Sequence, residues 1–163
     1  MKQLIIMLIA VFVLGYLAST AISELQPTAA EKPQVFTISG STEEKPSPSD
    51  WVKPGQIEVQ NNKIIINVEG ATWASFADTN SMDPVLDEGT TGIEIKPASP
   101  DQINVGDIIA YKSEYGVIIH RVAEKGEDND GVYFIAKGDN NNNADPNKIR
   151  FNDIERVLVA LIY

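Results

Sequence analysis

The chain has 163 residues, 43% of them hydrophobic, which allows one modest domain with a core and some appendages. Its formal net charge of -10 argues against a nucleic-acid partner, because binding phosphates requires a basic surface. The absence of cysteine excludes disulfides, thiolate catalysis and cysteine-ligated zinc.

Residues 4–22 are the first recognisable element. The run LIIMLIAVFVLGYLASTAI carries no charge and is long enough to cross a bilayer core, which takes about 20 apolar residues. We therefore expect a transmembrane helix, with residues 1–22 as a single-pass membrane anchor. Lys2 precedes the run and Glu24 follows it, so the positive-inside tendency places the rest of the chain on the extracytoplasmic side. The alternative is a cleaved signal peptide, although the apolar region of such peptides is typically about 7 to 15 residues long.

The next stretch, residues 23–55, is rich in Pro, Ser, Thr, Glu and Lys and holds few large apolar residues. This composition predicts a linker or stalk, because such a segment has little to bury. Within it, only the run VFTI at residues 35–38 fits a short strand that docks on the domain.

Residues 56–163 have the pattern of an all-β domain. Apolar residues on both sides of Asn61-Asn62 predict a hairpin, because asparagine tolerates the positive φ of a tight turn. Further strand-like runs, separated by Gly, Asp, Asn or Pro, cover residues 91–95, 107–111, 116–122, 131–136 and 156–163. The run EDNDG at residues 127–131 is interpreted as a hairpin turn rather than a metal site. No helical period is visible after the anchor.

Three short stretches carry groups suited to hydrolytic chemistry. Ser81 lies in the turn-like run NSMDP, His120 is the only histidine of the chain, and the run KGDNNNNAD at residues 137–145 holds Asp139 and Asp145. A serine, a histidine and an aspartate are the minimum parts of a nucleophile, its base and the group that orients the base.

These stretches, together with the run GDII at residues 106–109, stand in the order found in type I signal peptidases, which residues 73–163 resemble. Histidine at position 120, where the bacterial branch has lysine, is similar to the archaeal and endoplasmic-reticulum branch. The resemblance implies a catalytic domain of antiparallel β-sheets behind a membrane anchor. It also implies a serine endopeptidase that removes signal peptides.

The resemblance assigns a role to each candidate residue. Ser81 matches the nucleophile and His120 the general base. Asp139 and Asp145 match the two aspartates; we give Asp145 the orienting role and Asp139 a role in holding the loop, although the sequence leaves this division open. Thr79, two residues before the nucleophile, matches a position near the oxyanion hole, where the backbone N–H of Ser81 would also donate.

Other interpretations compete at several of these positions. His120 lies in an apolar strand and could be a buried structural histidine. Arg121 is expected to form an ion pair, because a guanidinium cannot act as a base. Lys137 could activate a serine, as in Ser-Lys peptidases, but we expect it to form a structural salt bridge. Trp73, Phe76 and Met82 are read as core residues, the alternative being exposure near substrate or membrane.

The run at residues 137–145 also has side chains with oxygen atoms at alternating positions, as the first half of a calcium-binding loop does. These are Asp139, Asn141, Asn143 and Asp145. Ala144 stands where such a loop needs glycine and Arg150 where it needs glutamate, so the sequence predicts no metal and no cofactor.

The sequence thus predicts a membrane-anchored serine peptidase that cuts exported preproteins after small residues and associates with the lipid bilayer but not with nucleic acid. It says nothing of accessory subunits. Two alternatives stay open: a related peptidase that processes another surface protein, and a non-catalytic anchored β domain that binds a partner or calcium.

Overall fold

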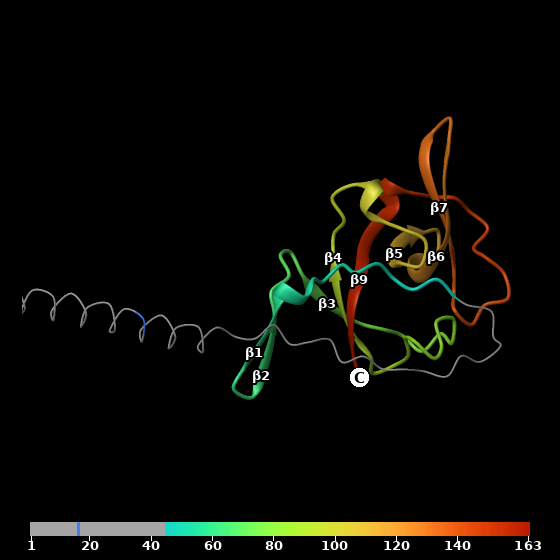
Figure 1. The fold of residues 1–163 in the computed structure, drawn as a ribbon. Helices are drawn as coiled ribbons and strands as arrows, with labels where there is room; N and C mark the ends of the chain where they lie inside the picture. Colours follow the sequence, from blue (N-terminus) through green and yellow to red (C-terminus); the bar gives the residue numbers. More distant parts are fainter. Residues whose placement is uncertain (1–15, 17–44) are drawn as a thin grey trace, which may run out of the picture. The chain divides into compact units, whose positions relative to one another are not determined.

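The computed structural model describes residue 16 and residues 45–163, and these fall into two compact units (Figure 1). One unit contains residues 54–67, and the other contains residues 45–53 and 68–163. The expected membrane segment at residues 4–22 and the possible strand at 35–38 lie outside the described residues, apart from the single residue 16. Within the described part, no helix is long and apolar enough to cross a membrane.

The smaller unit is built on the predicted hairpin. After a short 3-10 turn, Pro54–Gln56, strand β1 (Ile57–Gln60) pairs antiparallel with β2 (Lys63–Ile66). Asn61 has a φ of 53°, the conformation that the two asparagines were expected to supply. The hairpin prediction is therefore confirmed.

The larger unit is a seven-stranded sheet with every neighbouring pair antiparallel, in the order β3-β4-β9-β5-β6-β7-β8. The strands are β3 (Thr72–Ser75), β4 (Thr91–Ile95), β5 (Ile108–Ser113), β6 (Gly116–Asp128), β7 (Gly131–Lys137), β8 (Ile149–Arg150) and β9 (Ile154–Ile162). Two 3-10 turns, Pro100–Gln102 and Phe151–Asp153, are the only helical segments between residues 68 and 163. The prediction of an all-β domain with antiparallel sheets is confirmed. The short strand β8 was not predicted.

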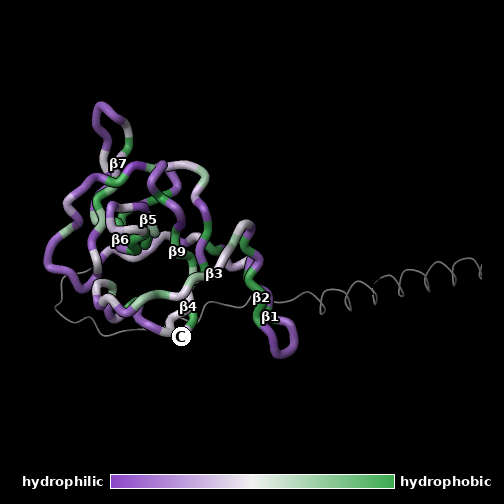
Figure 2. Tube along the Cα trace, turned by 180° about the vertical axis from the view of Figure 1, so that it is seen from behind, coloured by the Kyte–Doolittle hydropathy of each residue, from purple (hydrophilic) through white to green (hydrophobic). Residues whose placement is uncertain are grey.

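The strands of the larger unit bury side chains on both faces of the sheet, because successive residues point to opposite sides. On one face Ile109 and Val157 belong to a large cluster with Tyr111 and Phe134 at its centre. On the other face, a smaller cluster consists of Met82, Leu86, Ile108 and Leu158. In Figure 2, which colours the chain by hydropathy, hydrophobic residues lie along β5, β6 and β9, and hydrophilic residues lie in the connections outside them. The smaller cluster includes Met82, the neighbour of Ser81.

Residues 45–53, which we call the strap, pack against the larger unit. The backbone N–H of Ser49 donates to Asp107 Oδ1 at 2.6 Å, and Trp51 packs on the large cluster. Glycine is required at position 106, where φ is +100° and an added Cβ would lie 2.3 Å from the carbonyl oxygen of Ser47. The expected linker covers residues 23–55; of these, the strap has hydrogen-bond and apolar partners on the sheet. The domain is expected from residue 56, and residues 54–67 form a compact unit of their own.

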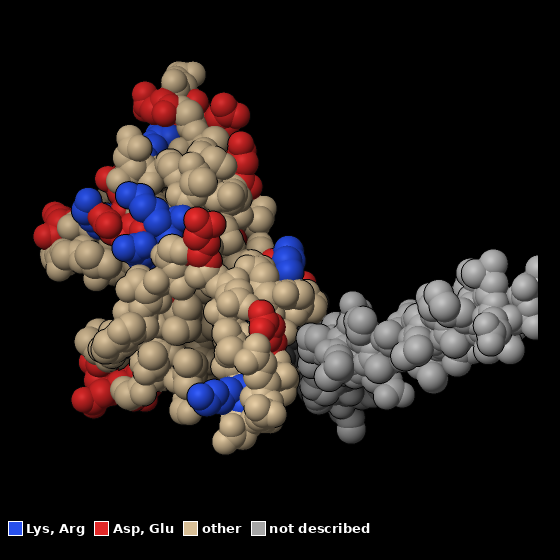
Figure 3. Space-filling view, turned by 90° about the vertical axis from the view of Figure 1, so that its left-hand side faces the viewer, with Lys and Arg blue, Asp and Glu red and all other residues tan. Residues whose placement is uncertain are grey.

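Charged side chains of both signs lie on the surface of the described residues. On the face drawn in Figure 3, acidic side chains appear in several places and the basic ones form separate groups rather than a continuous stripe. One mixed group consists of Asp128 with Lys148 and Arg150, joined by ion pairs.

The contact between strap and sheet leads to a prediction about Gly106. Gly106→Ala should destabilise the protein by at least about 1 kcal/mol more than Gly116→Ala, because steric overlap adds to backbone strain. Gly116 is the matched control, since its φ is +107° and nothing lies within 4 Å of an added Cβ. Urea unfolding of both variants measures the difference. Equal losses of stability would show that the strap does not press against this turn.

Candidate active site

Ser81 lies in a compact turn, residues 79–86, which we call the serine turn. Asn80 has a φ of 55°, and the backbone N–H groups of Val85 and Leu86 both donate to the carbonyl oxygen of Met82, at 2.9 and 3.0 Å. Met82 is 2% exposed and belongs to the smaller apolar cluster, whose other buried residues lie on β5, β9 and the turn itself. Burial of the residue next to Ser81 fixes the turn on the sheet while the serine remains half-buried.

The serine turn is also held by residues 138–145, which we call the acidic loop. The backbone N–H of Asn140 donates to the carbonyl oxygen of Ser81 at 3.0 Å, and the Asn140 side-chain amide donates to the carbonyl oxygen of Asn80 at 2.9 Å. The close contact between the acidic loop and the serine turn depends on Gly138, because a Cβ there would lie 2.5 Å from the Ser81 carbonyl oxygen. Segments almost 60 residues apart in the sequence are therefore joined through their backbones.

His120 lies on β6 and is 7% exposed. Its Nδ1 is 2.7 Å from Asp145 Oδ2, so the structure brings together the predicted base and the predicted orienting carboxylate. Asp145 is itself positioned by its backbone N–H, which donates to the carbonyl oxygen of Ala136 at 2.8 Å. A carboxylate at this nitrogen favours the tautomer with hydrogen on Nδ1, which leaves Nε2 as the basic atom.

Tyr111 is a member of this site that sequence reasoning missed. Its hydroxyl donates to the same Asp145 Oδ2 at 2.5 Å. Burial, and then the hydrogen bond to Asp145, raise the pKa of Tyr111 far above its ordinary value, which keeps the hydroxyl protonated and able to donate. The only sequence signal was its place in an apolar, strand-like run. In the structure Tyr111 pairs with Ile118, two residues before His120, so the side chains of Tyr111 and His120 share a face of the sheet.

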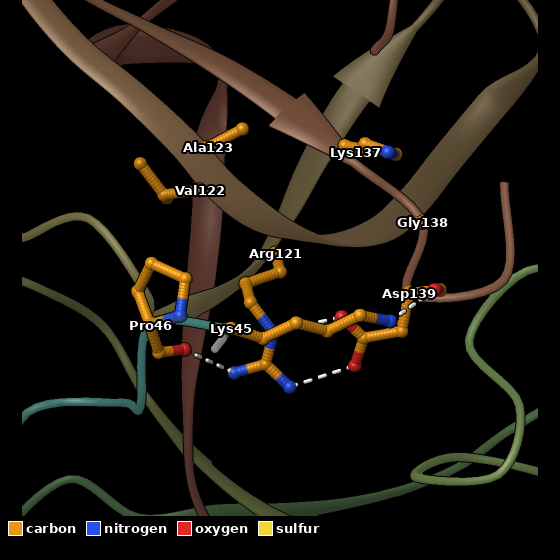
Figure 4. Close-up of a pocket in the computed structure, with 8 residues that line it drawn as sticks. All are labelled: Lys45, Pro46, Arg121, Val122, Ala123, Lys137, Gly138 and Asp139. Atoms are coloured by element: carbon orange, nitrogen blue, oxygen red, sulfur yellow. Dashed lines mark hydrogen bonds and ion pairs between the residues drawn. The ribbon is translucent and has the colours of Figure 1, made fainter. Parts of the chain in front are cut away.

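Asp139 has a different partner. The Arg121 guanidinium donates to both of its carboxylate oxygens, at 2.8 and 2.7 Å, and to the carbonyl oxygen of Pro46 (Figure 4). It also donates to the carbonyl oxygen of Gly106. Lys45 of the strap donates to the backbone carbonyl oxygen of Asp139. The two aspartates thus have different partners: Asp145 contacts the imidazole, and Asp139 contacts Arg121 and holds the loop.

The expectation of a structural salt bridge at Lys137 is wrong. This lysine forms no ion pair with any residue that the structure describes, and in Figure 4 its side chain points away from Arg121 and Asp139. Since Arg121 contacts both oxygens of Asp139, it occupies the carboxylate that a neighbouring lysine would have used. The ion-pair role expected of Arg121 is confirmed.

The acidic loop does not gather its oxygens around one point. Its two carboxylates are turned toward Arg121 and toward His120, and among the described residues no group of three or more acidic or histidine side chains could hold a metal ion. Nothing in this geometry favours the calcium alternative.

A cleft of about 540 Å³ is lined by three of the predicted site residues, whereas Asp139 and Asp145 are not part of its lining. Thr79, Ser81 and His120 all line it, and Thr79 Oγ1 lies 3.1 Å from Ser81 Oγ. The remaining lining is mostly apolar and comes from β3 and the residues after it, the serine turn, β5 and the start of β6; it includes Ala74, Phe76, Ala77, Met82, Leu86, Ala110, Val117, Ile118 and Ile119. The only buried acid in this lining is Glu94 of β4.

The aromatic residues expected in the core fall into two groups. Phe76 packs against the smaller cluster and Met82 is buried in it, as predicted. Trp73 is 70% exposed, so its assignment to the core was wrong. It lies on β3, whose other edge has no partner strand among the described residues.

Comparison with protein-family models, with curated proteins and with solved structures found no match for this chain.

The Arg121–Asp139 pair leads to a prediction about stability. Asp139→Asn should cost about 3 to 5 kcal/mol, because removing one partner leaves a nearly buried charge without compensation. The side chains of Arg121 and Asp139 are 12% and 5% exposed. Glu155→Gln is the matched control, because Glu155 is 36% exposed and pairs with an exposed lysine; its loss of stability should be far smaller, since solvent screens an exposed ion pair. Chemical unfolding compares the two, and similar small losses would contradict the anchoring role of Asp139.

Proposed function

We propose that this chain is a membrane-anchored serine endopeptidase of the signal-peptidase type, acting on exported preproteins outside the cytoplasm. The observation that carries the proposal is the 2.7 Å contact between His120 Nδ1 and Asp145 Oδ2 on an imidazole that shares a cleft with Ser81. These are the three side chains that the order of sequence motifs had singled out. Ser81 and His120 line the cleft, and Asp145 contacts the imidazole at Nδ1, which supports a Ser-His-Asp mechanism.

The proposed reaction uses each group in turn. Nε2 of His120 accepts the proton of the Ser81 hydroxyl as the serine oxygen attacks the scissile carbonyl carbon. Asp145 stabilises the imidazolium that forms, and Tyr111 holds Asp145 in place from a second direction. The imidazolium then protonates the leaving amine. Water hydrolyses the resulting ester through the same base.

The negative oxygen of the tetrahedral intermediate needs hydrogen-bond donors. The backbone N–H of Ser81 makes no hydrogen bond with any described residue, so it is available to donate. The Thr79 hydroxyl, 3.1 Å from Ser81 Oγ, is a second donor at the same place. Both groups belong to the serine turn, so the sheet contacts that fix the nucleophile also fix the oxyanion donors.

The cleft is suited to an extended peptide. Strand β3 has a partner only on its β4 side, and residues 117–120 of β6 pair with β5 but not with β7, whose pairing starts at Arg121. Both strands line the cleft, so each presents an unpaired backbone edge within the described part of the chain. A substrate strand can add to such an edge, and the mostly apolar lining favours uncharged side chains beside the cut.

The proposal is tested by replacing the nucleophile. Ser81→Ala in the full chain should abolish cleavage of a preprotein, while Ser99→Ala should leave it unchanged. Ser99 is a suitable control because its hydroxyl makes no capping hydrogen bond and lies outside the cleft. His120→Ala should also lower the rate, by roughly 1,000-fold or more. Cleavage is followed by mass spectrometry of the products, with circular dichroism as a test of folding. Full activity of a folded Ser81→Ala variant would rule out this nucleophile.

The Asp145 contact gives a separate prediction. Tyr111→Phe removes one donor to Asp145 and keeps the ring in the large cluster, so kcat should fall by about three- to tenfold, as for the loss of about 1 kcal/mol. Substrate affinity should not change, because Tyr111 does not line the cleft. Steady-state kinetics separates the two parameters. A raised KM with an unchanged kcat would contradict a role through Asp145.

A further inference from the structure

Glu94 is a buried acid that the proposed reaction does not use. It lies on β4, is 6% exposed, and lines the cleft that also contains Ser81 and His120. No hydrogen bond or ion pair joins its side chain to any residue that the structure describes. The positive charge of Arg156 acts on this carboxyl group, but no described residue forms a hydrogen bond with it.

The position is unfavourable for a carboxyl group unless something else contacts it. Burying a polar group without a hydrogen bond opposes folding, and the effect is larger for a charged group. Burial raises the pKa of Glu94, while the positive charge of Arg156 acts against this shift. The surrounding lining is mostly aliphatic, so a leucine or valine here would fit the cleft with less cost. A ligand bound in the cleft would supply the hydrogen bond that the Glu94 carboxyl group lacks.

We propose that Glu94 is a specificity-determining residue, whose carboxyl group binds the hydroxyl of a serine or threonine side chain of the substrate near the scissile bond. This inference rests on the proposed peptidase function and specifies its substrate class. It adds a hydroxyl at one position to the expectation of small residues beside the cut. Small residues still fit, but one of them carries a hydroxyl.

Two features favour a hydroxyl over an amine or guanidinium. A hydroxyl can donate to the ionised carboxylate or accept from the protonated acid, so it binds Glu94 in either state. A cation on the substrate would need the ionised state and would be repelled by Arg156, which already supplies positive charge at this position. The hydroxyl therefore fits the electrostatics of this position.

The test uses pairs of peptides that differ only in threonine or valine, which have nearly the same shape. The pair is placed in turn at each of several positions around the cut, and kcat/KM is measured for the full-length enzyme. We expect threonine to be preferred over valine at one position by roughly tenfold or more, as for a hydrogen bond to an ionisable group. In Glu94→Leu the preference should disappear or reverse. In Glu94→Gln, which keeps an amide able to bond a hydroxyl, a smaller preference should remain.

The outcomes separate this inference from the function on which it rests. Ser81-dependent cleavage with no threonine preference at any position would overturn the role of Glu94 and leave the peptidase intact. A preference that persists unchanged in Glu94→Leu would also overturn it. If no peptide is cleaved in a Ser81-dependent way, both proposals fail. Thermal unfolding of each variant shows that it is folded, and the glutamine variant provides the comparison if the leucine variant is not.

Discussion

The hydrogen bond between His120 and Asp145 is the interaction on which the account of this protein depends, and the fold supports it from three directions. The pairing of β5 with β6 puts Tyr111 and His120 on the same face of the sheet. The backbone of Asp145 is tied to β7 through Ala136, and the acidic loop is joined to the serine turn through Asn140. Each support comes from backbone pairing or from close backbone contact. The geometry at the imidazole is thereby a property of the sheet rather than of a free loop.

The acidic loop serves two neighbouring residues of β6 at once. His120 and Arg121 are consecutive on the strand, so their side chains leave it on opposite sides, and the loop provides a carboxylate for each. Asp145 lies at the imidazole, where chemistry is proposed, and Asp139 lies at the guanidinium, where it binds the loop to the sheet and to the strap (Figure 4). A chain with one carboxylate in this loop would have to give up either the anchor or the orienting group.

Much of the larger unit follows from local patterns in the sequence. Strand β4 was predicted with its observed bounds, and the hairpins at Asn61 and at residues 127–131 form where the turn residues predict them. Features that depend on distant contacts were not predicted. The docking of the strap depends on hydrogen bonds to Asp107, and the exposure of Trp73 depends on β3 lying at an edge of the sheet. Ser81, His120 and Asp145 were found from the order of motifs, whereas Tyr111 and Glu94 belong to no motif and emerge only when the strands are placed side by side.

Nuclear magnetic resonance of the imidazole nitrogens tests the central claim most directly, because the chain has a single histidine and its signals need no assignment among others. The account predicts that Nδ1 of neutral His120 carries a hydrogen in a bond to a carboxylate, a signal that Asp145→Asn removes, and that the Nε2 signal moves in Ser81→Ala. An Nδ1 signal unaffected by Asp145→Asn, or an Nε2 signal that does not respond to the loss of the Ser81 hydroxyl, would contradict it.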